Sequence, residues 1–333
     1  MSAAATTNPG PRTPNVLARA LHSEYLVLIL AAVYYLALLP FTPRFADRGN
    51  LANVLATLLP LFVVAIGQTL VLITGGIDLS VTSIMALASV VGAQAMNGEN
   101  GWLAGSIWAT PVGLLLMLLT GALVGLLNGA AVTGFRMPPF IVTLTSMMFF
   151  SGLAVWLTQS RTIYGLPPSF NALGGQTALA LVITALAALA AHVMLGRSLW
   201  GRWVYAVGHN ARAAAVSGVP VRAATISVYV VSGVAAALAA ILYTGQAETG
   251  SPVLGQRLLL DIIAATVIGG TSLFGGRGKV LWTLFGVLFI KLIDNSLNLL
   301  NLSLFAITLV KGGVILLAAL LDALRNRLST SGS

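Results

Sequence analysis

Long stretches without charged residues, each near the length that crosses a bilayer, recur along this chain of 333 residues. A helix needs about 20 apolar residues to span the hydrocarbon core of a membrane. Only 8% of the residues are charged, whereas soluble domains carry about a quarter. A soluble fold of this composition has too few polar groups to cover its surface. The sequence therefore predicts a single all-α, polytopic membrane protein without a separate soluble domain.

The apolar runs give the number of spans. The runs long enough for a span lie at 25–42, 51–74, 79–96, 109–133, 139–158, 176–195, 223–243, 280–297 and 303–321, and one shorter run covers 261–270. With the shorter run included, we expect about ten transmembrane helices. They would form a transmembrane domain at 21–325, between an N-terminal cytoplasmic tail at 1–20 and a C-terminal tail at 326–333.

The basic residues predict the orientation. With ten spans and a cytoplasmic N-terminus, the inward loops hold Arg12, Arg19, Arg136, Arg197, Arg202, Arg212, Arg222, Arg277, Lys279, Arg325 and Arg327, and the outward loops hold Arg44, Arg48, Arg161 and Arg257. Cytoplasmic loops carry an excess of Lys and Arg. Both termini are therefore expected in the cytoplasm, and the net charge of +9 reflects orientation in the bilayer, not nucleic-acid binding.

Several kinds of chemistry have no support in the sequence. The chain has no cysteine, which excludes disulfides, thiolate metal sites and thiol nucleophiles. Its three histidines lack metal-ligand spacing, so we expect no metal and no cofactor. The glycine-rich stretch from Val267 to Lys279 is not a phosphate-binding loop, because Leu273 and Val280 stand where that motif needs glycine and Ser or Thr. It is expected to be a tight inward turn with a basic edge.

A break in an apolar helix is the first candidate site. In the segment QTLVLITGGIDLSVTS, from Gln68 to Ser83, one helix is expected to stop at Gly75–Gly76 and another to start after Asp78. One interpretation is a capped turn, because Asp78 and Ser80 have side-chain oxygens that accept from free amides of the next turn. The other is a broken helix at membrane depth, which presents backbone groups to a polar solute. On that reading the candidate pathway residues are Gln68, Thr74, Gly75, Gly76, Asp78, Ser80 and Asn128.

Small residues predict close packing of the helix that carries Asn128. Gly121, Gly125 and Gly129 repeat every four residues and leave one smooth face. Such faces let helix backbones approach closely, and we expect this one to pack within the chain. Asn128 either bonds to a neighbouring helix or faces a pore.

Charged residues inside the spans are expected to pair. Lys291 and Asp294 lie three residues apart on one helix face, and Asp261 is a partner for Lys311. We interpret these as structural ion pairs, since a proton relay would use more buried acids. Replacing Asp261 by alanine is expected to strand Lys311.

Four segments, taken together, resemble the permease family of ribose-type ABC importers. They are TGGIDLSV at 74–81, MPPFIVTL at 137–144, VGHNARAAAVSGV at 207–219 and DIIAATVIGGTSLFGG at 261–276, in the family's order and spacing over about 50–320. The resemblance implies a permease of the bacterial inner membrane that passes a pentose or hexose and is not itself an enzyme. It also implies three kinds of partner: a second permease copy or paralogue, two cytoplasmic ABC ATPase subunits, and a periplasmic sugar-binding protein.

The resemblance also implies where the ATPase docks. The segment 207–219 matches the family's coupling helix, and it falls in the largest inward loop, 196–222, which is basic. The implied contact residues are Gly208, His209, Asn210, Arg212, Ala214, Ser217 and Gly218. Gly208, Asn210 and Ser217–Gly218 suit the turns and caps that flank a short helix. The alternative is a solvated basic loop.

Other functions stay open at this point. A permease for branched-chain amino acids or nucleosides has a related fold, although the Gly-Gly-Ile-Asp-Leu-Ser run favours the sugar group. A secondary transporter or passive channel would need no ATPase, and a membrane enzyme would form product without partners.

Overall fold

A computed structural model describes residues 25–330 and is helical throughout, apart from its loops. The helices are α2 Leu26–Leu38, η1 Pro43–Ala46, α3 Arg48–Ile73, α4 Val81–Met96, α5 Ala109–Gly134, α6 Pro139–Thr158, α7 Pro168–Gly175, α8 Thr177–Arg197, α9 Leu199–Val216, α10 Val221–Ala247, α11 Leu259–Ile268, α12 Val280–Leu299 and α13 Leu304–Thr330. The all-α prediction is confirmed. The tail predicted at 1–20 lies outside the described residues, and α13 continues through the predicted C-terminal tail as far as Thr330.

The apolar helices fall into two length classes. Six of them, α3, α5, α6, α8, α10 and α12, are long and apolar enough to cross a membrane. Shorter apolar helices are α2, α4, α11 and the stretch Leu304–Val314 of α13. At 1.5 Å per residue, the 10 residues of α11 extend about 15 Å, half of the hydrocarbon core.

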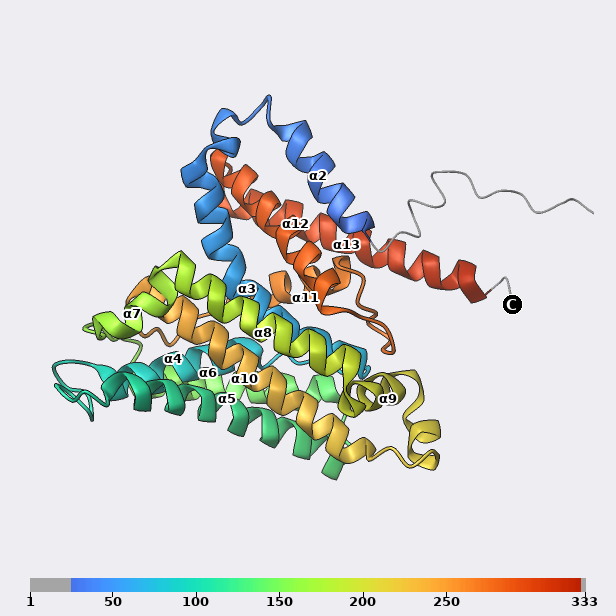
Figure 1. The fold of residues 1–333 in the computed structure, drawn as a ribbon, viewed down its shortest axis with the longest axis horizontal. Helices are drawn as coiled ribbons and strands as arrows, with labels where there is room; N and C mark the ends of the chain where they lie inside the picture. The colour runs from blue at the N-terminus through green and yellow to red at the C-terminus, as the bar shows by residue number, and fades with distance from the viewer. Residues whose placement is uncertain (1–24, 331–333) are drawn as a thin grey trace, which may run out of the picture.

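Helix α3 connects the two parts of the molecule. Figure 1 shows α2, α12 and α13 gathered on one side, and α4, α5, α6, α8 and α10 on the other. α3 contacts both α12 and α10, and it is the most buried of the six long apolar helices. α3 therefore begins beside α2 and α12, and its C-terminal end lies among the helices of the larger group, which includes α10.

The glycine face of α5 packs against α10. A Cβ on Gly121 or Gly125 would overlap the carbonyl oxygen of Gly233 or Tyr229, and one on Gly129 would lie 2.8 Å from the Cα of Ile226. Any side chain on this face would push α10 away. The predicted packing within the chain is confirmed.

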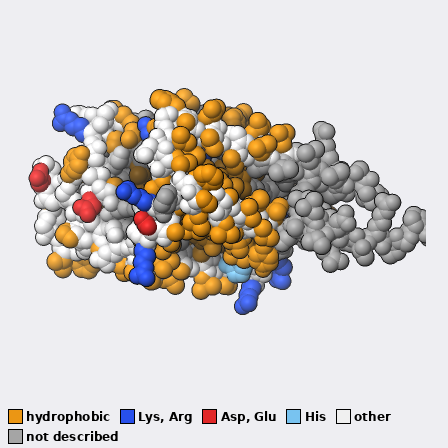
Figure 2. Space-filling model, turned by 90° about the horizontal axis from the view of Figure 1, so that it is seen from above, with side chains coloured by type: hydrophobic (Ala, Val, Ile, Leu, Met, Phe, Trp, Pro, Cys, Tyr) orange, Lys and Arg blue, Asp and Glu red, His pale blue; other side chains and the backbone are white. Residues whose placement is uncertain are grey.

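The other face of α5 is suited to lipid. Leu115, Leu119 and Leu123 recur every four residues and are each more than half exposed. Hydrophobic side chains also cover most of the surface seen in Figure 2, and charged side chains occupy only a few places on it. A soluble monomer rarely exposes a continuous apolar surface of this kind, so these helices fit a bilayer.

Loops that the charge pattern placed on the same side of the membrane lie together. Among the segments predicted to face outward, the amide of Gly98 donates to the carbonyl of Gly165, and Ile163 and Gly250 form a two-bond β-bridge. Among the inward segments, the amide of Gly276 donates to the carbonyl of Ile73 over 2.8 Å. The stretch 159–175, predicted to face outward, also contains α7, a short helix that the sequence did not predict.

Candidate functional site

The break between α3 and α4 is present. α3 ends at Ile73, the chain turns through Gly75 with φ of +76°, and α4 begins at Val81. Gly76 is held tightly, because a Cβ there would lie 2.8 Å from the phenol oxygen of Tyr229. Thr74 is half-buried and its hydroxyl donates to the carbonyl of Val71.

A buried polar network occupies this break. Oδ1 of Asp78 accepts from the amide and the hydroxyl of Ser80 over 3.0 and 2.6 Å, and Oδ2 accepts from the hydroxyl of Ser232 over 2.9 Å. Nδ2 of Asn128 donates to the hydroxyl of Ser80 over 2.8 Å. The network therefore joins the break to α5 and α10, and all four side chains are buried.

The capping interpretation needs a correction at Ser80. Ser80 stands at the N-cap of α4 but makes no side-chain capping bond there. Its hydroxyl is already used, because it donates to Asp78 and accepts from Asn128. The tertiary network has replaced the local cap.

Asn128 of this network also lines a groove between α5 and α6. The groove has a volume of about 470 Å³, and its walls include Phe135, Phe149 and Phe150. Ser146 lines it as well, and its buried hydroxyl has no hydrogen-bond partner within the described part of the chain. Most of the lining is apolar, and the polar side chains in it, Asn128, Thr145 and Ser146, carry no charge.

Gln68 is not part of the network. Its side chain is completely buried in α3, and neither its Oε1 nor its Nε2 has a hydrogen-bond partner among the residues that the structure describes. The next residue, Thr69, bonds instead to Thr283 of α12 over 2.6 Å. Burying an amide without partners is costly, so Gln68 is the least satisfied of the candidate residues.

The loop predicted to face inward contains the expected cap at Asn210 and the expected turn at Gly218, whereas Gly208 lies within α9 and forms no turn. α9 is interrupted at Asn210, which has φ of −163° and ψ of 102°. Its Oδ1 accepts from the amides of Arg212 and Ala213, each over 3.0 Å, and so caps a short helix. That helix ends before Gly218, which has φ of +82° and whose amide donates to the carbonyl of Ala215.

The side chains along this short helix point mostly to solvent. Arg212 and Ser217 are exposed and Ala214 is buried. His209 is exposed as well, and its Nδ1 lies 2.7 Å from the carbonyl oxygen of Tyr205. Burial raises the pKa of the Tyr205 phenol above its ordinary value, so it stays protonated and donates to the carbonyl of Gly278 over 2.7 Å.

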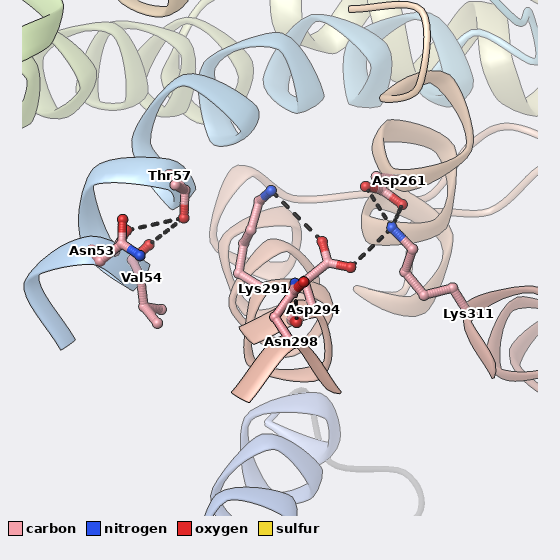
Figure 3. Close-up of polar contacts among 8 residues, drawn as sticks. All are labelled: Asn53, Val54, Thr57, Asp261, Lys291, Asp294, Asn298 and Lys311. Carbon is pink, nitrogen blue, oxygen red and sulfur yellow. Dashed lines mark hydrogen bonds and ion pairs between the residues drawn. The ribbon is translucent and has the colours of Figure 1, made fainter. Parts of the chain in front are cut away.

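The four charged residues that were expected to pair within the spans, Asp261, Lys291, Asp294 and Lys311, form one cluster (Figure 3). Lys311 lies 2.7 Å from Asp261, and Lys291 lies 3.8 Å from Asp294. Lys311 also lies 2.9 Å from Asp294, a contact that the sequence did not predict. The expectation that Asp261→Ala strands Lys311 is therefore wrong, because Asp294 remains as its partner.

Sequence reasoning missed Ser232. It lies in the apolar stretch YVVSGVAAA of α10, where a lone serine gives no signal of the carboxylate that it contacts. Asp78 is 154 positions away in the sequence. Only the close approach of α10 to the break brings the two together.

The comparisons with known proteins agree on one family of transport proteins. Residues 50–320 match the family described as "Branched-chain amino acid transport system / permease component". The ribose import permease protein RbsC of Bacillus subtilis (strain 168) is 38% identical over 84% of this chain and 86% of its own length. RbsC of Escherichia coli (strain K12) is 34% identical over 91% of this chain and 94% of its own length.

The similarity extends to a second named sugar permease. The L-arabinose transport system permease protein AraH of Escherichia coli (strain K12) is 31% identical over 98% of both chains. No solved structure matches the chain. With a family match over 50–320 and relatives that align along most of its length, the chain belongs to the ribose-type sugar permeases of ABC importers and is a multi-pass inner-membrane protein.

Proposed function

We propose that this chain forms the transmembrane pathway for a monosaccharide, a pentose or a hexose, in an ATP-driven importer. One observation carries the proposal: relatives named for ribose and L-arabinose align over at least 84% of the chain. The matched region 50–320 contains both the helix break and the inward loop of α9. The chain has the part that passes the sugar, and ATP hydrolysis belongs to a separate subunit.

The solute path runs past the helix break. Of the candidate residues, Asp78, Ser80 and Asn128 meet in the buried network, and Asn128 extends from it to the α5–α6 groove. Thr74, Gly75 and Gly76 form the adjoining turn, and Gln68 precedes it on α3. Hydroxyl and amide groups of this kind match the hydrogen-bonding groups of a sugar.

The partners follow from the same assignment. Two ATPase subunits dock at the inward loop 196–222 through Gly208, His209, Asn210, Arg212, Ala214, Ser217 and Gly218. A second permease copy or a paralogue completes the pathway, and a periplasmic sugar-binding protein delivers the substrate. The ion pairs of Asp261, Lys291, Asp294 and Lys311 have a structural role and do not relay protons.

The proposed topology has ten spans, with both termini in the cytoplasm. The six long apolar helices and the four shorter ones supply that number, and the grouping of the loops supports the orientation that the basic residues indicate. The short helix α11 decides the orientation of the spans that follow it. If α11 did not cross the membrane, the last span would run in the opposite direction.

Introduced cysteines test the topology without background, since the chain has none of its own. Gln256 and Leu273 are exposed on the two sides of α11. We expect Gln256→Cys to react with a membrane-impermeant maleimide on intact cells, and Leu273→Cys to react only after permeabilisation. Asn100→Cys serves as the outward control and Ser217→Cys as the inward one. Labelling of both Gln256→Cys and Leu273→Cys from the same side would contradict the crossing of α11.

The function is tested in proteoliposomes that contain the chain with its ATPase and binding protein. We expect uptake of labelled ribose, arabinose or glucose that requires ATP and is not reduced by excess leucine or inosine. The family description mentions branched-chain amino acids, so leucine uptake would favour that alternative. Sugar uptake that continues without ATP would favour a secondary transporter or channel.

A further inference from the structure

Three backbone segments that are distant in the sequence meet without intervening side chains at Gly208 of α9. A Cβ on Gly208 would overlap the carbonyl oxygen of Ile73 and lie 2.6 Å from the amide nitrogen of Gly276. A Cβ on Gly275 would lie 2.8 Å from the carbonyl oxygen of Gly208 and 3.0 Å from the amide nitrogen of Gly75. The end of α3, α9 and the turn at 269–279 are thus in direct contact.

The contact is reinforced on each side. The amide of Gly276 donates to the carbonyl of Ile73, which α3 leaves free at its end. The hydroxyl of Tyr205 donates to the carbonyl of Gly278 over 2.7 Å, and the His209 ring would lie 3.2 Å from a Cβ on Gly276. Gly75, Gly275 and Gly276 all have positive φ, so side chains are disfavoured at these positions for conformational as well as steric reasons.

This junction lies between the two candidate sites. Gly208 is two residues before Asn210, where the short exposed helix begins. Ile73 is five residues before Asp78, the centre of the buried network. Closely packed backbone transmits displacement because it has no free space to absorb it, so the short helix cannot shift far without moving the end of α3.

We infer that Gly208 is a positioning residue that transmits movement of the coupling helix into the α3–α4 break, through direct backbone contact with Ile73 and the turn at Gly275–Gly276. The inference rests on the proposed function and adds the route by which the ATPase would act on the sugar path. The residue works because it lacks a side chain: adding one separates the surfaces that must move together.

The experiment compares Gly208→Ala with wild type in the complete transporter in proteoliposomes. We expect ATP hydrolysis to continue and sugar uptake per ATP to fall about tenfold, within the range of coupling between protein sites. Gly196→Ala is the matched control, since nothing lies within 4 Å of a Cβ at Gly196. Tyr205→Phe removes only the bond to Gly278, and we expect a smaller loss of uptake per ATP. If Gly208→Ala does not fold, Tyr205→Phe by itself tests the inference.

A cysteine at Ile77 reports on the break itself. In the wild-type background we expect its reaction rate with a soluble maleimide to differ between the nucleotide-free and the ATP–vanadate states, and in Gly208→Ala we expect this difference to disappear. The inference is overturned if both variants keep uptake per ATP and the difference in labelling. It is also overturned if Gly208→Ala no longer binds the ATPase, because the loss of uptake would then come from weaker docking and not from the route to the break. Failure of the proposed function is distinguishable, because wild type itself would then take up no sugar.

Discussion

Replacing Lys311 by methionine is expected to destabilise the folded protein by about 3–5 kcal/mol, the usual effect of removing one partner from a buried ion pair. Lys311 contacts both Asp261 and Asp294, at 2.7 and 2.9 Å. Without it, Asp261 keeps no ion-pair partner among the described residues, and Asp294 keeps only Lys291 at 3.8 Å. Heating detergent-purified protein and measuring the surviving monodisperse fraction would show a large drop in melting temperature.

Two matched variants make this prediction specific. Asp261→Asn leaves Lys311 paired with Asp294, so we expect a smaller loss than in Lys311→Met. The double variant Lys311→Met with Asp261→Asn removes the pair as a whole, and we expect it to recover most of the stability, because an apolar or neutral replacement of a buried pair is often tolerated. A double variant less stable than Lys311→Met would contradict a structural role for the pair.

Replacing Gln68 by leucine is expected to stabilise the protein and to impair transport at the same time. Removing a buried amide that has no partner should raise the free energy of unfolding by about 1–3 kcal/mol. Because the proposed path brings the sugar to Gln68, losing a hydrogen bond to the sugar should lower uptake about tenfold, which corresponds to about 1.4 kcal/mol. Melting temperature and uptake, measured on the same preparation, would then change in opposite directions.

Thr184 of α8 offers the matched control. Its hydroxyl is also buried without a hydrogen-bond partner in residues 25–330, and it lies outside the proposed path. We expect Thr184→Val to stabilise the protein without changing uptake. Full uptake by Gln68→Leu would remove Gln68 from the path.

Much of the architecture could be predicted because its causes are local. Gly75 and Gly76 interrupt an apolar run, and the repeat of Gly121, Gly125 and Gly129 marks a contact face wherever its partner lies. Charges inside apolar spans are expected to pair, which was enough to bring Asp261 to Lys311.

The remaining features depend on tertiary contacts. Lys311 reaches Asp294 because α11, α12 and α13 converge, and no spacing in the sequence encodes that. Ser80 looks like a helix cap until Asn128 and Asp78 occupy its hydroxyl. The junction at Gly208 was the hardest to predict, because a glycine that contacts distant backbone has the same sequence signature as one in a simple turn.

The central claim is that sugar passes the α3–α4 break along the α5–α6 groove, and a cysteine at Ser146 tests it most directly. Ser146 lines the groove with Asn128, and the substitution changes one atom in a chain without other cysteines. In the reconstituted transporter, we expect modification by a methanethiosulfonate reagent to stop ATP-driven uptake, and excess transported sugar to slow the modification. Complete modification that leaves uptake intact, at a rate that sugar does not change, would contradict the claim.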